Sequence, residues 1–476
     1  LNDGAIAFLV ADVSGKGIPA AMFMMRAKTV IRDLAERGLE PDEIFTIANE
    51  KLCENNDAGM FVTAWLGIVD MKSGILSYAN AGHNPPLIYK KSEDKFEYLK
   101  SSDSGINTII GLDGQYSMMQ AAMVNAYSSH YLELDDGHRG GMIHLGSPMI
   151  TAILMQAEME QWDNQKVLDA IIIAYEAAII LAKAIQPKHK KAGYHTSATV
   201  GSIAAVLAIG CVQGKDVETL HVMLAMAATS CAGILRVQDD ASELKPFNIS
   251  QAVVNIISVV FFGDASLRGV NDVFADKKGF LDIFGGNTND VNLERDPEVY
   301  QIETIYIKPY PSCRHCHSPY EAALRIREKG MKVKDIEKVE VGIYQLAIAG
   351  HDHNEIKGIN SAKLSIPYNV ALGLYVGLNN MAQYSEETIS EEALLDLCRK
   401  IVIYEDKELT ALCPRKRSAV VSVFTKSGTY ARCRVDDPKG EPENPLSQQE
   451  FLEKFTGLLE NCGYTSQEAL KLYEMS

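Results

Sequence analysis

Three short segments of the sequence place histidine directly before a predicted helix. Two of the segments each precede an apolar run, and they are His144-Leu-Gly-Ser-Pro and Tyr-His195-Thr. The third is Cys-Arg-His-Cys-His317, which is followed by Ser-Pro and a third helical pattern. A helix start offers free N–H groups and the positive end of a dipole, which bind carboxylate or phosphate. An adjacent imidazole can hydrogen-bond an anion or move a proton. One such segment also fits an ordinary capped helix beside a surface histidine, but three of them predict a small-anion site. The candidate binding residues are Ser147, Thr196, Cys313, Arg314, His315 and His317.

The same segments predict how the three helices begin. Each helix is expected to have a hydroxyl residue as its N-cap, because a hydroxyl can accept a free N–H of the first turn. The expected N-caps are Ser147, Thr196 or Ser197, and Ser318. Pro148 and a second proline after Ser318 suit the first helical position.

An acidic segment, Glu133-Leu-Asp-Asp136, lies just before His144. It can orient imidazoles, bind a metal ion or form a solvated loop. Lys245 and Lys308 each precede a proline, and Lys308 ends a predicted strand. A lysine facing a pocket would neutralise a substrate carboxylate, whereas a surface position is the alternative for each. The candidate catalytic residues are His144, His195, Lys245, Lys308, Glu133 and Asp136.

A separate candidate metal ligand, Asp12, follows the apolar run Ala5–Ala11, which is expected to be a buried strand. Val-Ser-Gly-Lys-Gly17 follows it. A carboxylate between a strand and a glycine turn is a common way to present oxygen to a hard cation. A two-metal hydrolytic site needs several carboxylates, so Asp12 by itself predicts a vestigial site. Mn²⁺ or Mg²⁺ is expected there only if this part of the chain is functional.

Hydrophobic periodicity divides the chain into pieces of different character. A helix to about Arg37, with Pro19 in its first turn, and a hairpin of Phe61–Asp70 with Gly74–Asn80 are predicted first. Helices dominate from Ile106 to Val291. From Ile302 onward strands and helices alternate, and a capping box at Ser447 opens a last helix. The main predicted helices are Gln165–Ala184, Ser197–Gly210, Asp216–Ala232, Ser250–Phe262, Ser318–Lys329 and Glu391–Arg399, and the later strands are Ile302–Ile307, Ile336–Tyr344, Ala419–Thr425 and Tyr430–Val435.

Composition narrows the class of partner. The formal net charge of −16 and the isoelectric point of about 5.2 argue against nucleic acid and anionic membranes, which need a cationic footprint. The apolar stretches fall short of the ~20 residues of a membrane span. Nine cysteines at irregular spacing indicate free thiols in a reducing compartment, so a cytoplasmic location is expected. No basic leader is visible, and the natural start is expected upstream of Leu1. Cys313–His317 matches a haem-attachment pattern, but that attachment requires export, so haem is not expected.

Residues 1–101 resemble the bacterial metal-dependent protein phosphatases of type 2C. The resemblance lies in Val10–Ala21, Gly59–Asp70 and Tyr78–Leu87. It implies metal contacts from Asp12 and the carbonyl of Val13. The other ligand segments of that family would lie before residue 1 or after Tyr98, where the sequence changes character, so a partial domain is expected.

Residues 104–476 resemble the MmgE/PrpD family, which includes 2-methylcitrate dehydratase, cis-aconitate decarboxylase and iminodisuccinate epimerase. The resemblance implies a helical domain over 104–300 that lacks its first helices, an α+β lid over 301–437, C-terminal helices over 438–476 that return to the helical domain, and a homodimer. It implies a pocket without metal or organic cofactor. The similar stretches are Ala121–Glu158, Gly193–Leu207, Leu244–Ala252, Lys308–Ala323, Asn360–Gly377 and Pro414–Phe455.

Several positions depart from the decarboxylases of that family. Glu133 stands where they have aspartate, Gly137 where they have threonine, and Cys313 where they have a pocket histidine. Asn248 and Ser250 replace a frequent histidine and glycine. These differences count against a cis-aconitate decarboxylase.

The sequence therefore predicts a mainly α protein with an α+β lid, preceded by a partial α/β phosphatase-like fragment. The expected enzyme is a lyase or isomerase that abstracts a proton next to a carboxylate of a small di- or tricarboxylate, with a hydro-lyase like 2-methylcitrate dehydratase favoured. Lys245, Lys308 and Arg314 would hold carboxylates, and His144 or His195 would be the base. The alternatives are a regulatory phosphatase remnant and an inactive chimera.

Overall fold

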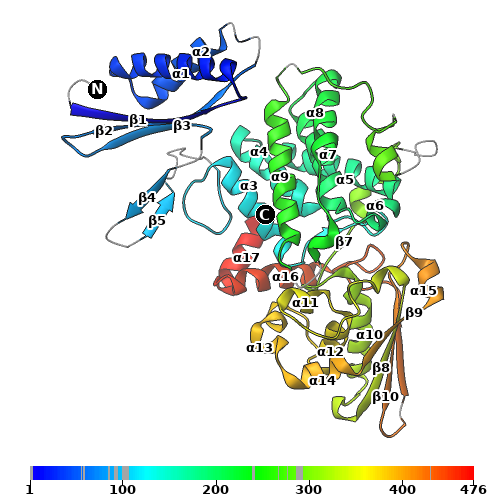
Figure 1. Ribbon diagram of the computed structural model, residues 1–476. Coiled ribbons are helices and arrows are strands. Elements are labelled where there is room, and N and C mark those ends of the chain that lie inside the picture. The colour runs from blue at the N-terminus through cyan, green and yellow to red at the C-terminus, as the bar shows by residue number, and fades with distance from the viewer. Residues whose placement is uncertain are drawn as a thin grey trace. The chain divides into compact units, whose positions relative to one another are not determined.

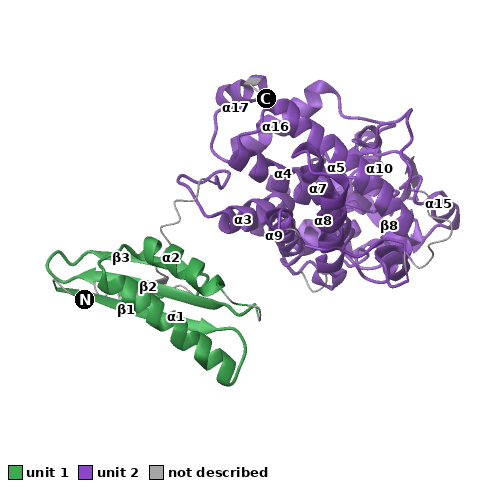
Figure 2. Cartoon of the chain, turned by 90° about the horizontal axis from the view of Figure 1, so that it is seen from above, with its two compact units in different colours: residues 1–105 green, residues 106–476 purple. Residues whose placement is uncertain are grey.

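The computed structural model divides the chain into two compact units, Leu1–Gly105 and Ile106–Ser476 (Figure 2). Each unit has its own hydrophobic core, which in the second unit consists of two clusters. The structure describes residues 4–54, 56, 59–83, 86–90, 95–98, 107–238, 242–265, 267–275, 277–285, 293–428 and 430–475.

The first unit is a three-stranded antiparallel sheet, in the order β1-β2-β3, with two helices packed on one face (Figure 1). Leu34 and Ile44 from the helices meet Leu66 of the central strand in a small core. The opposite face of β1 carries Phe8, which is 52% exposed. The predicted strands and first helix are confirmed, but β1 is not the buried strand that was expected, because its residues alternate between half-buried and exposed. The elements are β1 Ala5–Val13, α1 Ile18–Glu36, α2 Pro41–Cys53, β2 Val62–Asp70, β3 Leu76–Ala81, and the separate hairpin β4 Leu87–Lys90 with β5 Lys95–Tyr98.

The second unit begins with a helical domain arranged around α7, Thr196–Val212 (Figure 1). Fourteen of the 17 residues of α7 are buried, because α4, α5, α8 and α9 surround it. Its many alanines, glycines and small hydroxyl residues let these neighbours approach closely. The other helices are α3 Met118–Tyr131, α4 Gly146–Glu160, α5 Asn164–Ile185, α6 Lys188–Lys191, α8 Val217–Ser230 and α9 Lys245–Phe262.

Helix α9 is long and apolar enough, by length and composition, to cross a membrane. More than half of that window is buried inside the protein, where α9 packs against α3, α4, α7 and α8. Its apolar character therefore serves the helical core. The helix begins at Lys245, five residues before the predicted start at Ser250.

An α+β domain follows, with a four-stranded sheet in the order β11-β10-β8-β9 (Figure 1). All neighbouring strands are antiparallel except β8 and β9. Helices α10 and α12 pack together over this sheet and close its core. The elements are α10 His317–Glu328, β8 Ile336–Ile343, α11 Ile359–Leu364, α12 Ile366–Tyr375, α13 Glu386–Ile389, α14 Glu392–Arg399, β9 Ile401–Glu405, α15 Lys407–Leu412, β10 Ala419–Thr425 and β11 Tyr430–Val435.

Two predictions for this domain are corrected. The expected strand Ile302–Ile307 is mostly a 3₁₀ turn, Gln301–Thr304, whose first N–H donates to the buried Glu176 carboxylate at 2.8 Å. Only Tyr306 and Ile307 form a strand, β7, and it pairs with β6 (Asp136–Gly137) of the helical domain. Strand β9 was not predicted, because five residues after a helix give little periodicity to read.

The predicted hydroxyl caps of the three helices are also wrong. Helices α4, α7 and α10 have no side-chain cap from Ser147, Thr196 or Ser318. Each hydroxyl is used in a tertiary contact instead. Ser147 Oγ donates to Asp135 at 3.1 Å, and Ser197 Oγ accepts the N–H of His144 at 3.0 Å.

The chain ends with α16, Gln448–Asn461, and α17, Ser466–Met475. The predicted capping box at Ser447 and Glu450 is present. Lys454 of α16 donates to the carbonyl of Leu134 at 2.9 Å, so this helix contacts the acidic segment of the helical domain.

Candidate functional site

A two-residue ladder brings the acidic segment and Lys308 together. In the antiparallel pair β6–β7, Asp136 lies opposite Ile307 and Gly137 opposite Tyr306. The next position of this ladder sets Asp135 opposite Lys308, and cross-strand neighbours of opposite charge attract. Lys308 Nζ accordingly lies 2.9 Å from Asp135 Oδ1.

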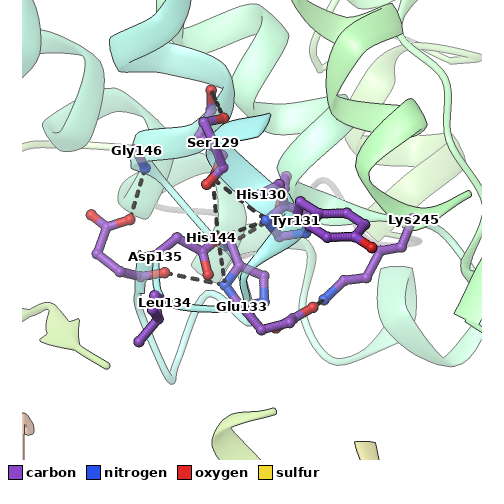
Figure 3. A network of polar contacts seen from close by, with 12 residues as sticks. Ser129, His130, Tyr131, Glu133, Leu134, Asp135, His144, Gly146 and Lys245 are labelled. Carbon is purple, nitrogen blue, oxygen red and sulfur yellow. Dashed lines mark hydrogen bonds and ion pairs between the residues drawn. The ribbon is translucent and has the colours of Figure 1, made fainter. Parts of the chain in front are cut away.

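Glu133 joins two lysines that are far apart in the sequence. Its carboxylate lies 2.7 Å from Lys308 Nζ. It also forms an ion pair with Lys245 at the start of α9 (Figure 3). Glu133 has a φ of 55°, a left-handed conformation that non-glycine residues rarely adopt. Burial would raise the pKa of the Glu133 carboxyl, but Lys245 and Lys308 hold that pKa well below its usual range. The carboxylate is therefore ionised and held between two cations.

Two imidazoles contact Asp135, and a third lies close to one of them. His130, at the end of α3, has Nδ1 2.7 Å from Asp135 Oδ2 (Figure 3). His144 has Nδ1 3.1 Å from the carbonyl of Asp136 and 3.3 Å from Asp135 Oδ2. Both neighbours of His144 Nδ1 are acceptors, so Nδ1 carries the proton and Nε2 keeps its lone pair. The centre of the His130 ring lies 5.1 Å from that of His144 and 6.0 Å from that of His195.

His195 is held in the opposite tautomer. Asn248 Nδ2 donates to the carbonyl of Ile234 at 3.2 Å, which sets the orientation of its amide. The same nitrogen lies 3.4 Å from His195 Nδ1, which must then accept, so Nε2 carries the proton. His195 Nε2 is buried and has no hydrogen-bond partner among the residues that the structure describes. A buried donor without a partner at a site of this kind can serve a bound ligand.

Burial favours the neutral form of His144 and of His195. It lowers the pKa of His144 well below the usual range, although Asp135 acts in the opposite direction. Burial also lowers the pKa of His195, and His130 adds to that effect. A neutral imidazole can accept a proton at neutral pH, which a general base requires.

A small cavity lies between the helical and the α+β domains, against these charges. Its volume is about 20 Å³, roughly the space of one water molecule. Lys363 reaches it from α11, and its Nζ donates to the carbonyl of Tyr131 at 3.2 Å. Burial lowers the pKa of Lys363 to about 8. The walls are His130, Tyr131, Glu133, Ser242, Lys245, Pro246, Asn360, Lys363 and Leu364.

A larger cavity of about 800 Å³ lies on the other side of the acidic segment. Its walls are mostly apolar, including Ile150, Leu154 and Met155, and its charged residues are Asp135, Asp136, Glu158 and Lys454. An anion there would face three carboxylates and one ammonium group. The cation-lined space at the domain boundary suits a carboxylate substrate better, even though it is smaller.

Asp136 supports helix α4. Its Oδ1 accepts the N–H groups of Gly146 at 2.8 Å and Leu145 at 3.3 Å, and its other oxygen accepts the hydroxyl of Tyr175. Burial raises the pKa of the Asp136 carboxyl, and the bonds from Tyr175 and Gly146 oppose that shift. The predicted catalytic residue Asp136 thus lies beside the histidines but is occupied in capping a helix.

The third histidine segment divides into two groups. Arg314 is 2% exposed, and its guanidinium bonds Glu441, His317 Nδ1 and the carbonyls of Pro438 and Lys439. These contacts use all five of its N–H groups, so none is free for a substrate carboxylate. Arg314 therefore binds the 438–441 segment, and His317 binds Arg314.

Cys313 and His315 lie elsewhere, beside His351, which the sequence analysis did not select. Cys313 Sγ is 3.9 Å from His351 Nε2, and the centres of the His315 and His351 rings are 5.1 Å apart. Among the described residues, this is the one group of three or more possible ligands close enough to hold a metal ion. Asp12 belongs to no such group, and it is exposed at the end of β1.

Of the remaining predicted residues, Ser147 lies at Asp135, and Thr196 lies against Gln186 Nε2 at 2.9 Å. The structure brings together His144, His195, Lys245, Lys308 and Glu133, and it adds three residues that were not selected: His130, Asn248 and Lys363. A motif-based selection cannot find them, because a lone histidine or lysine on a helix has no distinguishing local pattern.

The sequence matches two kinds of protein domain. Residues 97–292 match the MmgE/PrpD N-terminal domain, and residues 310–475 match the MmgE/PrpD C-terminal domain. Residues 2–139 match the stage II sporulation protein E family, and this match overlaps the first one over residues 97–139.

Individual relatives agree with this division. The cis-aconitate decarboxylase of Aspergillus terreus is 24% identical over 380 residues, covering 74% of this chain and 77% of that protein. The 2-methylcitrate dehydratase of Salmonella typhimurium is 29% identical over 174 residues, covering 34% and 36%. The phosphoserine phosphatase RsbU of Bacillus subtilis is 29% identical over 166 residues, covering 35% and 45%. The chain thus spans less than half the length of the latter two.

Proposed function

Because the chain belongs to the MmgE/PrpD family from residue 97 onward, we propose that it is a lyase or isomerase of a small di- or tricarboxylate. The observation that carries the proposal is a pair of neutral histidines in opposite tautomers, the half-buried His144 and the buried His195. Both rings lie near His130, which lines the lysine-lined space at a domain boundary. The shared chemistry is removal of a proton from a carbon next to a carboxylate.

His144 is the proposed base, and His195 is the proposed hydrogen-bond donor to the leaving group. The Nε2 lone pair of His144 takes the proton from carbon, while the carbonyl of Asp136 and the carboxylate of Asp135 stabilise the imidazolium that forms. The Nε2–H of His195 hydrogen-bonds the hydroxyl group on the neighbouring carbon, and that group departs as water with the proton that His144 took from carbon. Re-protonation of the same carbon would instead give epimerisation.

Lysines supply the charge that the intermediate needs. Abstraction next to a carboxylate gives an enolate-like dianion, which fixed cations stabilise. Lys245 and Lys308 are paired with Glu133, and Lys363 has no carboxylate partner among its described contacts. A substrate carboxylate can meet Lys363 and share Lys245 with Glu133. The cavity of about 20 Å³ is too small for such a substrate, so the α+β domain must open to admit it.

We favour dehydration, and Gly137 counts against a site of the cis-aconitate decarboxylase type. A β-carbon at this position would collide with the Tyr306 hydroxyl and lie 2.8 Å from the carbonyl of Ile143. The threonine that resemblance to the decarboxylases predicts therefore has no room here. This supports a site that differs from theirs.

The first test is proton NMR of the folded protein in heavy water with citrate, 2-methylcitrate and cis-aconitate. Deuterium entering a carbon next to a carboxylate, or a new product, is expected with at least one compound. His144→Ala and His195→Ala should each lower the rate by about 10²–10⁴-fold. His221→Gln on α8 is the matched control and should keep the wild-type rate.

Two outcomes would overturn the proposal. One is full turnover in both His144→Ala and His195→Ala. The other is no exchange with the panel when the folded wild-type protein is shown by calorimetry to bind none of these carboxylates.

A further inference from the structure

Cys313, His315 and His351 form a compact group of soft ligands in the α+β domain. One ligand atom from each residue lies within 4.8 Å of the others. His315 is 5% and His351 8% exposed, whereas Cys313 is partly exposed. Ligand atoms around a tetrahedral zinc ion are roughly 3.3–3.8 Å apart, given Zn–N and Zn–S bonds of about 2.0 and 2.3 Å. The distance of 3.9 Å from Cys313 Sγ to His351 Nε2 is close to that geometry.

The backbone holds two of these residues against one segment. The N–H of Cys313 donates to the carbonyl of Lys363 at 2.9 Å, and the carbonyl of His351 accepts the N–H of Ile366 at 2.8 Å. Residues 363–366 thus fix both ligands from the same side. A site that is assembled before its ion arrives loses less freedom when the ion binds.

Each imidazole has a hydrogen-bond partner on one nitrogen. His351 Nδ1 lies 3.0 Å from the carbonyl of Leu364, which leaves Nε2 directed at Cys313. His315 Nδ1 lies against the hydroxyl of Tyr344, which leaves its other nitrogen for a metal. Histidines that bind metals nearly always use their second nitrogen in this way, because the bond sets the tautomer and the ring orientation.

We propose that Cys313, His315 and His351 bind a Zn²⁺ ion, with a fourth position open to water or to a carboxylate. One thiolate and two imidazoles suit zinc, and three protein ligands with an open position are typical of reactive zinc sites. Binding releases the thiol proton of Cys313 to solvent. The ion carries two positive charges and the thiolate one negative charge, so the occupied site has a net charge of +1.

The surroundings favour an anion at the open position. Lys190, Arg417 and Lys245 all act electrostatically on this group. A bound carboxylate would offset the charge of the ion and of these side chains. Glu133 and His144 also act electrostatically on Cys313 and His315, respectively, so residues of the proposed carboxylate site influence this group. The zinc site is independent of the proposed reaction, because its test needs no substrate.

The test is titration of the chelator-treated full-length protein with Co²⁺, followed by competition with Zn²⁺. One equivalent of Co²⁺ is expected, with the visible bands of a tetrahedral site and a near-ultraviolet sulfur-to-cobalt charge-transfer band. Cys313→Ser should abolish the charge-transfer band. His351→Ala should weaken binding at least tenfold, and Tyr344→Phe, which keeps all three ligands, should weaken it by less.

Cys413→Ser is the matched control, because it removes a neighbouring thiol that is not in the group. It should bind Co²⁺ with the wild-type spectrum. Circular dichroism establishes that each variant is folded. Absence of stoichiometric Co²⁺ binding by the folded wild-type protein would overturn the proposal, and so would a charge-transfer band that persists in Cys313→Ser.

Discussion

Lys308 illustrates how one residue joins both domains of the second unit. It follows β7 directly, is fully buried, and contacts the carboxylates of Glu133 and Asp135. Burial alone would lower the pKa of its ammonium group, but the two carboxylates raise that pKa above the ordinary value. The lysine therefore stays charged and compensates two buried negative charges.

We predict that Lys308→Met destabilises the protein by about 3–5 kcal/mol, because it leaves two buried carboxylates with less compensation. Urea unfolding at neutral pH measures the effect. The exposed Lys183→Met on α5 is the control and should change the free energy of unfolding by less than about 0.5 kcal/mol. Equal stability of the two variants would contradict the buried ion pairs.

At the scale of elements, the acidic segment organises the helices around it. The segment ends α3, supplies β6, and caps α4 through Asp136, while α9 begins at the lysine that pairs with Glu133. Helix α4 has no hydroxyl cap of its own. Its first turn therefore depends on a carboxylate that lies ten residues earlier in the chain and is also bonded by Tyr175.

We predict that Asp136→Ala destabilises the protein by about 2 kcal/mol or more, since it removes a helix cap and leaves the buried Tyr175 hydroxyl without its acceptor. Asp136→Asn keeps an oxygen for the cap and should cost less. The comparison is Asp163→Ala, which removes the exposed N-cap of α5 and should cost about 1 kcal/mol. Urea unfolding of the three variants gives the ranking, and an Asp136→Ala cost below that of Asp163→Ala would contradict the assignment.

At the scale of the whole molecule, two units with separate cores share one chain. The core of Leu1–Gly105 is small, and one face of its sheet exposes Phe8 and its neighbours on β1. The core of Ile106–Ser476 is far more extensive. Stability increases with the area that folding buries, so the first unit is expected to be the weaker one.

We predict two thermal transitions in scanning calorimetry of the full chain. Leu66→Ala in β2 should lower only the first transition, and Leu372→Ala in α12 only the second. Each substitution deletes a fully buried side chain and should cost its own unit about 2–5 kcal/mol. A single transition that both variants lower equally would mean that the units unfold together.

Local patterns predicted most elements of this fold. Apolar periodicity located α5, α7 and α8 within a few residues, and turn signals located the hairpin of β10 and β11. The same signals failed at Ile302–Ile307, where alternation suggested a strand. Most of this segment belongs to a 3₁₀ turn, whose first N–H donates to the Glu176 carboxylate. They also failed at the hydroxyl caps, because Ser147 and Ser197 have better partners that are distant in sequence.

The sequence by itself determined the division into a phosphatase-like piece and a MmgE/PrpD piece, the helical and α+β order of the second piece, and five residues that meet at one site. These properties depend on local spacing, charge and motif. Only the tertiary structure decided that Arg314 is occupied by Glu441, that His144 and His195 hold opposite tautomers, and that Cys313 and His315 face His351. The physical reason is that the partner of a side chain depends on which segments the fold brings within hydrogen-bond distance. Such segments can be far apart in the sequence, and Glu133 and Lys308, for example, are 175 residues apart.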